Sequence, residues 1–284
     1  MGTGVNWVRY WRDEARPLEA MHARFRDHVY ALHSHDAYSF GITDAGAQRF
    51  RCRGADHTSG AGMVMAFNPD EAHDGRSAAE LGYHYRIVHL GPSLIREILA
   101  DAADAAGTAD AEAAALPFFV RPVLTDPVLT GALARLHAAL VSGASDVLER
   151  DELLTATVVA MAERGATRAP RMHTLAGRAQ RQAARRAHAL LHESGAEAVT
   201  SEQLAGTAGC SRFALYRAFR AEFGMPPSDY QRQLRLRRAR RLLSDGATPA
   251  DAAAATGFAD QAHFGRWFKR VYGITPGVFQ RGRA

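Results

Sequence analysis

Residues 204–230, LAGTAGCSRFALYRAFRAEFGMPPSDY, decide the fold of this chain, because the chain repeats them. The second copy is 252–279, AAAATGFADQAHFGRWFKRVYGITPGVF, at an offset of 48 that becomes 49 after one inserted turn residue. The matched pairs are Ala205 with Ala253, Gly209 with Gly257, Leu215 with Phe264, Arg217 with Arg266, Phe219 with Phe268, Arg220 with Lys269, Gly224 with Gly273, Pro227 with Pro276 and Tyr230 with Phe279. So many matches at nearly one offset indicate two copies of one structural unit.

Each copy has the signals of a short helix, a tight turn and a second helix. In the first copy Thr200 or Ser201 can cap the first helix, and Gln203 follows Thr200 at the spacing of a capping box. Gly209 can adopt the positive φ of the turn, and Ser211 can cap the second helix. The second copy repeats these signals with Thr248, Pro249, Gly257 and Asp260. Both copies therefore predict a helix-turn-helix motif.

The second helix of each motif has an apolar face and a polar, partly basic face. The apolar residues, which we expect to be buried, are Leu215, Phe219 and Phe223 in the first motif and Phe264, Trp267 and Phe268 in the second. The opposite face carries Arg212, Phe213, Tyr216, Arg217 and Arg220 in the first motif and Gln261, Ala262, His263, Arg266, Lys269 and Arg270 in the second. Arginine and glutamine can read base edges in a DNA major groove, whereas Arg220, Lys269 and Arg270 are better placed for phosphates. For any single residue, a solvated helix face is the alternative interpretation.

A further amphipathic helix is predicted between the two motifs, in 228–246, SDYQRQLRLRRARRLLSDG. Its arginines are distributed around the helix, and the candidates for its buried face are Leu234, Ala239, Leu242 and Leu243. A helix of about 18 residues is roughly 27 Å long. Such a rigid connector suits two reading helices in successive major grooves, which lie about 34 Å apart.

The charge of the chain is unevenly distributed. The whole sequence has a net charge of +5, but residues 171–284 hold 19 basic and 8 acidic side chains, a net charge of +11. Residues 1–170 hold 16 basic and 22 acidic side chains, a net charge of −6. A basic half beside an acidic half indicates that only the C-terminal part meets a polyanion, although a solvated basic surface would give the same count.

The N-terminal region has the pattern of short strands. Residues 49–54, RFRCRG, alternate polar and apolar side chains, and residues 62–73, GMVMAFNPDEAH, predict a strand that stops at Asn68. Residues 83–91, YHYRIVHLG, predict another strand. Glycines separate these segments at close spacing, which is typical of a sandwich or a barrel.

Helical signals follow the strands from Ser93 onward. Residues 126–141 and 146–164 predict two amphipathic helices, whose apolar stripes are either packing faces or a dimer contact. The stretch that follows residue 164 is polar, contains proline and shows no apolar periodicity, which predicts an interdomain linker. The predicted organisation is a β-domain over 1–92, a helical dimerisation or linker region over 93–164, a linker over 165–175 and an all-α domain over 176–284.

The C-terminal repeat resembles the double helix-turn-helix DNA-binding domain of AraC/XylS-type transcription regulators. The resemblance covers about 180–282 and is carried by RARRLL, by GFADQAHFGRWFKRVYGITP and by the paired F(R/K)xx(F/Y)G endings. In that family the two recognition helices enter adjacent major grooves. The resemblance places the base-facing positions at Phe213, Tyr216, Arg217, Gln261, Ala262, His263 and Arg266. The predicted fold class is α+β, with an N-terminal β-barrel and a C-terminal all-α domain.

The N-terminal region, with HSHDAYSFG at 33–41, resembles the cupin-like barrel that binds an effector in many of these regulators. Metal-dependent cupins supply His-x-His and a glutamate in a first motif and one more histidine in a second. His33, His35 and His73 fall in the histidine positions, but Ser39 or Phe40 occupies the glutamate position. We therefore expect no metal, although three histidines could hold zinc or iron with an open site. Histidines that point outward or are hydrogen-bonded inside the barrel are a further alternative.

The candidates for the lining of the predicted effector pocket at the barrel mouth are His33, His35, Tyr38, Phe50, Phe67, His73 and Tyr85, of which we expect some to point into the barrel. Such a pocket combines apolar walls with a few polar anchors. We expect a sequence-specific DNA-binding regulator under effector control, with no catalytic residues and no cofactor. Its expected partners are double-stranded DNA, a small-molecule effector, a second copy of the chain and RNA polymerase. The alternatives are a β-domain that only dimerises and a metal-binding cupin activity.

The composition predicts a cytoplasmic protein. The first residues contain no apolar segment of a secretion signal, and no apolar run approaches the roughly 18–20 residues that span a bilayer. The two cysteines, Cys52 and Cys210, do not form a disulfide framework by their spacing. We therefore expect no membrane partner.

Overall fold

In the computed structural model of the chain, the described residues are 6–78, 80, 82–105, 116–142, 147–167, 175–194 and 199–282. Strands occupy the N-terminal part and helices the C-terminal part, which confirms the predicted α+β class. The predicted linker lies largely outside the described residues. Within the described residues, no helix is long and apolar enough to cross a membrane.

The N-terminal strands form two sheets that share one long strand. The strands are β1 (Trp7–Arg12), β2 (Leu18–Phe25), β3 (Tyr30–His33), β4 (Tyr38–Cys52), β5 (Ala55–Gly60), β6 (Val64–Phe67), β7 (His73–Ser77), β8 (Tyr83–Leu90) and β9 (Val123–Leu124). One sheet has the order β1-β2-β8-β4-β6-β9, and in the other sheet β4 pairs with β5 and β7, and β7 pairs with β3. All of these pairs are antiparallel.

The long strand β4 changes sheet near its middle. Its pairing with β8 shifts register between Thr43 and Ala45, and Gly46 follows with a φ of 72°. A Cβ at Gly46 would overlap the carbonyl oxygen of Gly82, so this position requires glycine both for its dihedral angle and for space. The bend lets one strand contribute to both walls of the barrel.

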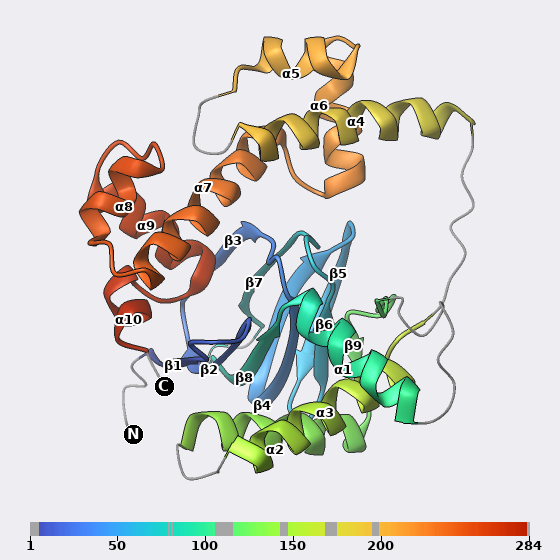
Figure 1. The fold of residues 1–284 in the computed structure, drawn as a ribbon, viewed down its shortest axis with the longest axis vertical. Coiled ribbons are helices and arrows are strands. Elements are labelled where there is room, and N and C mark those ends of the chain that lie inside the picture. The colour runs from blue at the N-terminus through green and yellow to red at the C-terminus, as the bar shows by residue number, and fades with distance from the viewer. Residues whose placement is uncertain are drawn as a thin grey trace.

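Three helices pack on the outside of the larger sheet. They are α1 (Pro92–Ala105), α2 (Pro127–Ser142) and α3 (Val147–Arg164), and the last two lie together along one side of the barrel (Figure 1). Their stripes form a core with the sheet, as the periodicity predicts, through Leu129, Leu133, Leu136, Leu140, Leu154, Val158 and Met161. The segment before α2, for which the sequence showed no strand signal, adds β9 to β6 and buries Phe119.

The C-terminal region consists of helices α4 (Leu175–Glu193), α5 (Ser201–Ala208), α6 (Arg212–Phe223), α7 (Pro227–Ser244), α8 (Pro249–Ala255), α9 (Gln261–Tyr272) and α10 (Pro276–Arg281). The predicted caps are confirmed. Thr200 and Gln203 form a capping box, and Ser211, Thr248 and Asp260 accept a backbone N–H at the start of α6, α8 and α9. Helices α5–α6 and α8–α9 are the two helix-turn-helix motifs, and α7 connects them.

The second motif shares a hydrophobic core with the barrel, whereas the first does not. Residues of α7, α8, α9 and α10 form one cluster with barrel residues such as Met21, Phe50 and Phe67. The first motif forms a separate cluster with α4 and the start of α7. Figure 1 shows α7 running beside the barrel, with α8–α10 against it and α4–α6 beyond the far end of α7. The barrel therefore opens toward the second motif.

Helix α7 buries a different face from the predicted one. Ala239 and Leu243 are buried as expected, but Leu234 and Leu242 are only half-buried. The buried positions also include Gln233, Leu236 and Arg237, because this side of the helix contacts the barrel. Polar side chains can be buried on this face of α7 because the barrel supplies their hydrogen-bond and ion-pair partners.

Candidate ligand pocket and nucleic-acid interface

A pocket lies inside the barrel, on the side that faces the second helix-turn-helix motif. The barrel strands supply Tyr10, Glu19, Met21, Tyr30, His33, His35, Gln48, Phe50, Met65, Phe67, His73, Asp74, Gly75, Tyr85, Ile87 and His89. The C-terminal helices and the turn after α9 supply Arg240, Val271, Tyr272, Ile274 and Phe279. Its empty volume is about 710 Å³, including the open side. The pocket walls therefore come from both domains.

Of the seven residues predicted to line a pocket, the structure brings six together and excludes Tyr38. The hydroxyl group of Tyr38 donates a hydrogen bond to the carbonyl oxygen of Pro117 at 2.7 Å. Side chains alternate along β4, so Tyr38 and Phe40 point into the core beneath α2 and α3. Ser39, between them, points to the opposite face and contacts His89. The prediction for Tyr38 was wrong because the register shift in β4 between Thr43 and Ala45 places Tyr38 and Phe50 in different cores, although the two are an even number of residues apart.

Four histidines gather at one end of the pocket. We call His33, His35, His73 and His89 the histidine cluster. Ring centroids lie 4.5 Å apart for His33 and His73, 4.9 Å for His33 and His35, and 4.6 Å for His35 and His89. One ring nitrogen of His33, one of His35 and one of His73 all lie within 4.8 Å of one another. His89 was missed by the sequence analysis, although its alternation with Tyr85 and Ile87 on β8 places it on the pocket face.

The hydrogen bonds of the cluster fix the protonation of two rings. Nδ1 of His33 lies 2.7 Å from the carbonyl oxygen of Ala31, and Nδ1 of His73 lies 2.8 Å from that of Glu71. A carbonyl oxygen only accepts, so each Nδ1 carries the proton and each neutral ring has its lone pair on Nε2. Burial lowers the pKa of all four imidazoles, to about 4 for His73 and His89. The cluster is therefore uncharged at neutral pH.

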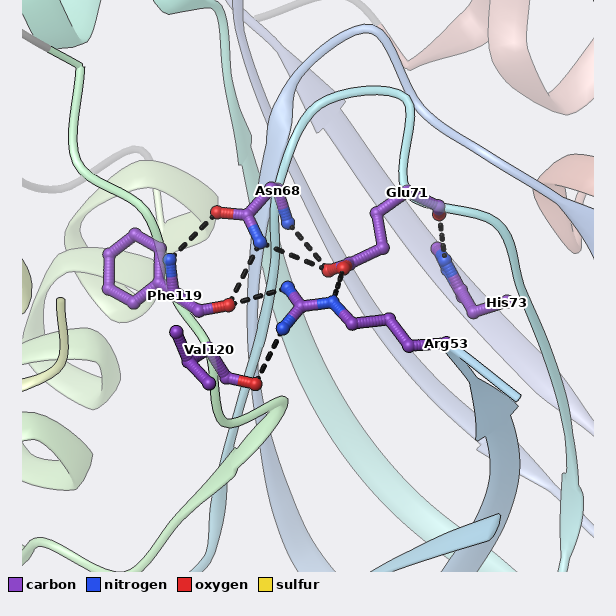
Figure 2. Close-up of polar contacts among 6 residues, drawn as sticks. All are labelled: Arg53, Asn68, Glu71, His73, Phe119 and Val120. Carbon is purple, nitrogen blue, oxygen red and sulfur yellow. Dashed lines mark hydrogen bonds and ion pairs between the residues drawn. The ribbon is translucent and has the colours of Figure 1, made fainter. Parts of the chain in front are cut away.

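The turn that carries His73 is held by a polar network (Figure 2). The Glu71 carboxylate pairs with Arg53 and accepts from the Asn68 side chain at 3.2 Å. Asn68 also exchanges hydrogen bonds with the backbone of Phe119, donating at 3.0 Å and accepting at 2.9 Å. Arg53 donates to the carbonyl oxygens of Phe119 and Val120 at 2.6 Å and 2.5 Å. This network ties the turn to the segment before β9 and fixes the backbone that accepts from His73.

Polar contacts join α7 to the barrel beside the pocket. Arg240 pairs with Glu19 at 3.0 Å, and Arg237 pairs with Asp70 at 2.7 Å. Burial raises the pKa of the Asp36 carboxyl, but Arg240 and Arg237 outweigh this effect and hold that pKa below its usual value. The acidic half and the basic half therefore meet at this helix, and two of its arginines are occupied by the barrel.

An aromatic contact joins the barrel to the end of α9. The Tyr30 hydroxyl lies 2.6 Å from the hydroxyl of Tyr85, and both residues line the pocket. The Tyr30 ring also contacts Gly273, the C-cap of α9, where a Cβ would overlap it. No pattern in the sequence could identify Tyr30 or the C-terminal pocket residues, because packing between domains brings them together.

The predicted DNA-reading faces are exposed where the structure describes their side chains. The exposed residues are Arg217, Arg220, Gln261, Ala262, Arg266, Lys269 and Arg270. The side chains of Arg212, Phe213 and Tyr216 lie outside the described part. His263 is half-buried, and its Nε2 accepts a hydrogen bond from the indole of Trp267 at 3.0 Å.

Trp267 packs against the edge of the core but is only half-buried, whereas the prediction was that it is buried. Its ring is half-buried and lies under the guanidinium groups of Arg232, at 4.0 Å, and Arg270, at 5.4 Å. The stacking covers the indole without burying it in the core. Phe264 and Phe268 are fully buried as predicted, so the error concerns the edge of the apolar face.

Comparison with known proteins supports both domains. Residues 17–158 match the family model of the AraC-like ligand binding domain, and residues 204–282 match that of a helix-turn-helix domain. The HTH-type transcriptional regulator YbfI of Bacillus subtilis is 27% identical over 231 residues, covering 81% of this chain and 80% of that protein. The transcriptional activator RhaS of Escherichia fergusonii is 37% identical over 97 residues, which is 34% of each chain.

A solved structure shares the whole fold. A crystal structure of an apo ToxT variant from Vibrio cholerae superposes with a TM-score of 0.57 at 11% identity, covering 95% of this chain and 99% of that chain. At this identity the likeness concerns the fold alone, including the succession of barrel, helices and paired motifs. The matches of both domains show that this chain belongs to the AraC family of transcription regulators, with an N-terminal ligand-binding domain and a C-terminal DNA-binding domain.

Proposed function

We propose that a small organic effector binds in the interdomain pocket and controls how the second helix-turn-helix motif is held against the barrel. The observation that carries this proposal is that the pocket takes its walls from both domains. A molecule in the pocket contacts Phe50 and Phe67 of the barrel as well as Tyr272 and Ile274 of the DNA-binding domain. It would favour the domain arrangement in which both sets of contacts form, and thereby shift the population of DNA-competent molecules.

The lining points to an effector with an apolar body and a polar end. Aromatic and aliphatic side chains cover most of the pocket, and the histidine cluster with the Tyr30–Tyr85 pair supplies polar atoms. Two ToxT structures of the same fold are described as bound to an unsaturated fatty acid (TM-score 0.51) and to (E)-4-(8-methylnaphthalen-1-yl)but-3-enoic acid (TM-score 0.55). Both ligands have an apolar body and an acid group, which supports this class for the present pocket.

For the DNA-binding domain, we propose that α6 and α9 read two successive major grooves. Arg217, Gln261 and Arg266 are exposed on these helices and suit base edges, and Arg220, Lys269 and Arg270 suit phosphates. The connecting helix α7 has 18 residues, the predicted length, which supports this proposal. We further propose a homodimer through α2 and α3, which lie on the side of the barrel away from α8–α10 (Figure 1), and contact with RNA polymerase at the promoter.

The effector proposal is tested by a thermal-shift screen of small metabolites against the full chain, because a ligand stabilises the state it binds. We expect hits to raise the melting temperature and to change the affinity for operator DNA in a gel-shift assay. Ile274→Trp fills the pocket from the C-terminal side and should remove the response to a hit. A hit whose shift survives Ile274→Trp and leaves DNA affinity unchanged would contradict an interdomain effector site.

A further inference from the structure

Three histidine side chains of the pocket converge from two paired strands, β3 and β7, and from the turn that follows β3. His33 ends β3 and His73 begins β7, and the two residues are direct cross-strand partners. Cβ atoms of such partners lie about 4.5–5.5 Å apart, so their rings can meet at one point. His35 follows two residues after His33, and one ring nitrogen from each of the three lies within 4.8 Å of the others.

The second nitrogen of two of these rings is fixed by the backbone. Nδ1 of His33 donates to Ala31, and Nδ1 of His73 donates to Glu71, whose own position is held by Arg53 and Asn68 (Figure 2). A backbone acceptor on one nitrogen orients the ring and leaves the other nitrogen as a ligand, which is the usual environment of metal-bound histidine.

The acidic side chains of the pocket have other partners. Glu19 pairs with Arg240, and the Asp74 carboxylate accepts from the backbone N–H of Arg51 at 2.6 Å. The converging donor set is therefore all imidazole, which suits zinc, iron, nickel, cobalt and copper and does not suit magnesium or calcium. Three protein ligands would leave a tetrahedral ion one position for a donor atom from water or a small molecule.

We propose that His33, His35 and His73 bind a divalent transition-metal ion of the zinc class in the interdomain pocket. This inference deepens the proposed effector site and rests on it for its role in regulation, but not for metal binding itself. It replaces the expectation from the missing cupin glutamate, because the three rings converge without a carboxylate. A donor group of the effector could then complete the coordination of the ion.

The test titrates full-length, chelator-treated protein with Co²⁺ and follows the visible absorption of tetrahedral cobalt. We expect saturation at about one Co²⁺ per chain, loss of the signal on adding Zn²⁺, and a higher melting temperature with Zn²⁺. His33→Ala and His73→Gln should each weaken binding tenfold or more. The ring of His35 is less buried than those of His33 and His73, so its replacement should disturb folding less. His35→Ala therefore tests the same site if the other variants fold poorly.

The matched control is His84→Ala, which removes a histidine of β8 that packs on Trp7 outside the pocket. It should keep one Co²⁺ per chain and the same affinity. Absence of a cobalt spectrum, or equal binding by the folded His33, His35 and His73 variants, would overturn the metal site. Ligand-induced thermal shifts in metal-free protein would then show that the organic effector site stands without it. If the protein binds a metal ion but no organic compound of the screen raises its melting temperature, the metal site stands and the effector proposal is wrong.

Discussion

Gly224 and Gly273 end the second helices of the two helix-turn-helix motifs with nearly the same dihedral angles but different neighbours. Their φ and ψ angles are 73° and −10° in the first motif and 73° and −9° in the second. A Cβ on Gly224 would meet the side chain of Ala72, at the edge of the barrel, whereas a Cβ on Gly273 would overlap the pocket residue Tyr30. The comparison shows that two copies with one local structure can have different roles: the first packs mainly on α4, and the second closes the sensor pocket.

The largest test of this difference uses the matched core residues Phe219 and Phe268, which are both fully buried. Phe219→Ala and Phe268→Ala should each lower the free energy of unfolding by about 3–5 kcal/mol. Urea denaturation of the full chain measures this loss. Because only Phe268 belongs to the core shared with the barrel, only its substitution should also reduce the thermal shift caused by an effector. Equal loss of the effector response in both variants would contradict the assignment of the second motif to the pocket.

The C-cap glycines provide the next test. Gly224→Ala and Gly273→Ala place a Cβ in the left-handed region, which costs about 1–2 kcal/mol at either position. Gly273→Ala should cost more and weaken effector binding, because the new methyl group also displaces Tyr30. Gly246→Ala is the control for backbone strain alone, since Gly246 has a φ of 94° and no atom near its missing Cβ. Urea denaturation and the thermal shift together separate strain from loss of the pocket contact.

If both motifs contact DNA, matched substitutions in α6 and α9 should weaken operator binding to a similar extent. Arg217→Ala and Arg266→Ala are matched substitutions at exposed repeat positions. Each should weaken operator binding by about 1–3 kcal/mol and relax base preference in its own half of the operator. Gel-shift titrations on operators with base changes in either half measure both effects. Unchanged operator affinity in Arg266→Ala would show that α9 faces away from the bases.

The smallest expected effect is a pH dependence of stability that arises from two histidines packed on the first motif. Nε2 of His188 and His192 lies 2.7 Å and 3.0 Å from the Tyr230 hydroxyl, while the repeat partner of Tyr230 is a phenylalanine. Burial lowers the pKa of both histidines, so the unfolded state binds more protons between their folded pKa and the ordinary value of about 6.5. Stability should therefore be fully present above about pH 6.5 and fall as the pH decreases below it. His188→Gln should flatten this decline in melting curves at several pH values, and an unchanged slope would exclude the contribution.

Most of the candidate site could be predicted where one element supplies the pattern. The alternation of strands places Phe50, Phe67 and Tyr85 in the pocket, and the same rule identifies His89 beside Tyr85 and Ile87. It does not exclude Tyr38, because the register shift in β4 interrupts the alternation between Phe50 and Tyr38. Helical spacing placed Trp267 on the apolar face, but it lies at the edge of that face, where two arginines cover the part of the ring that the core leaves exposed. The direction of a side chain at the edge of a face depends on its neighbours, which periodicity does not contain.

The sequence by itself determined the paired helix-turn-helix motifs, because caps, turn glycines and apolar spacing act within a few residues of chain. It also indicated the strand-rich region between residues 49 and 91 and the separation of charge between the two halves. Only the tertiary structure decided that Arg240 meets Glu19, that Tyr30 meets Gly273 and that the pocket has a C-terminal wall. These contacts join residues far apart in the chain, 221 positions for Arg240 and Glu19. They form because the open side of the barrel and one face of α7–α10 bury their apolar surfaces against each other.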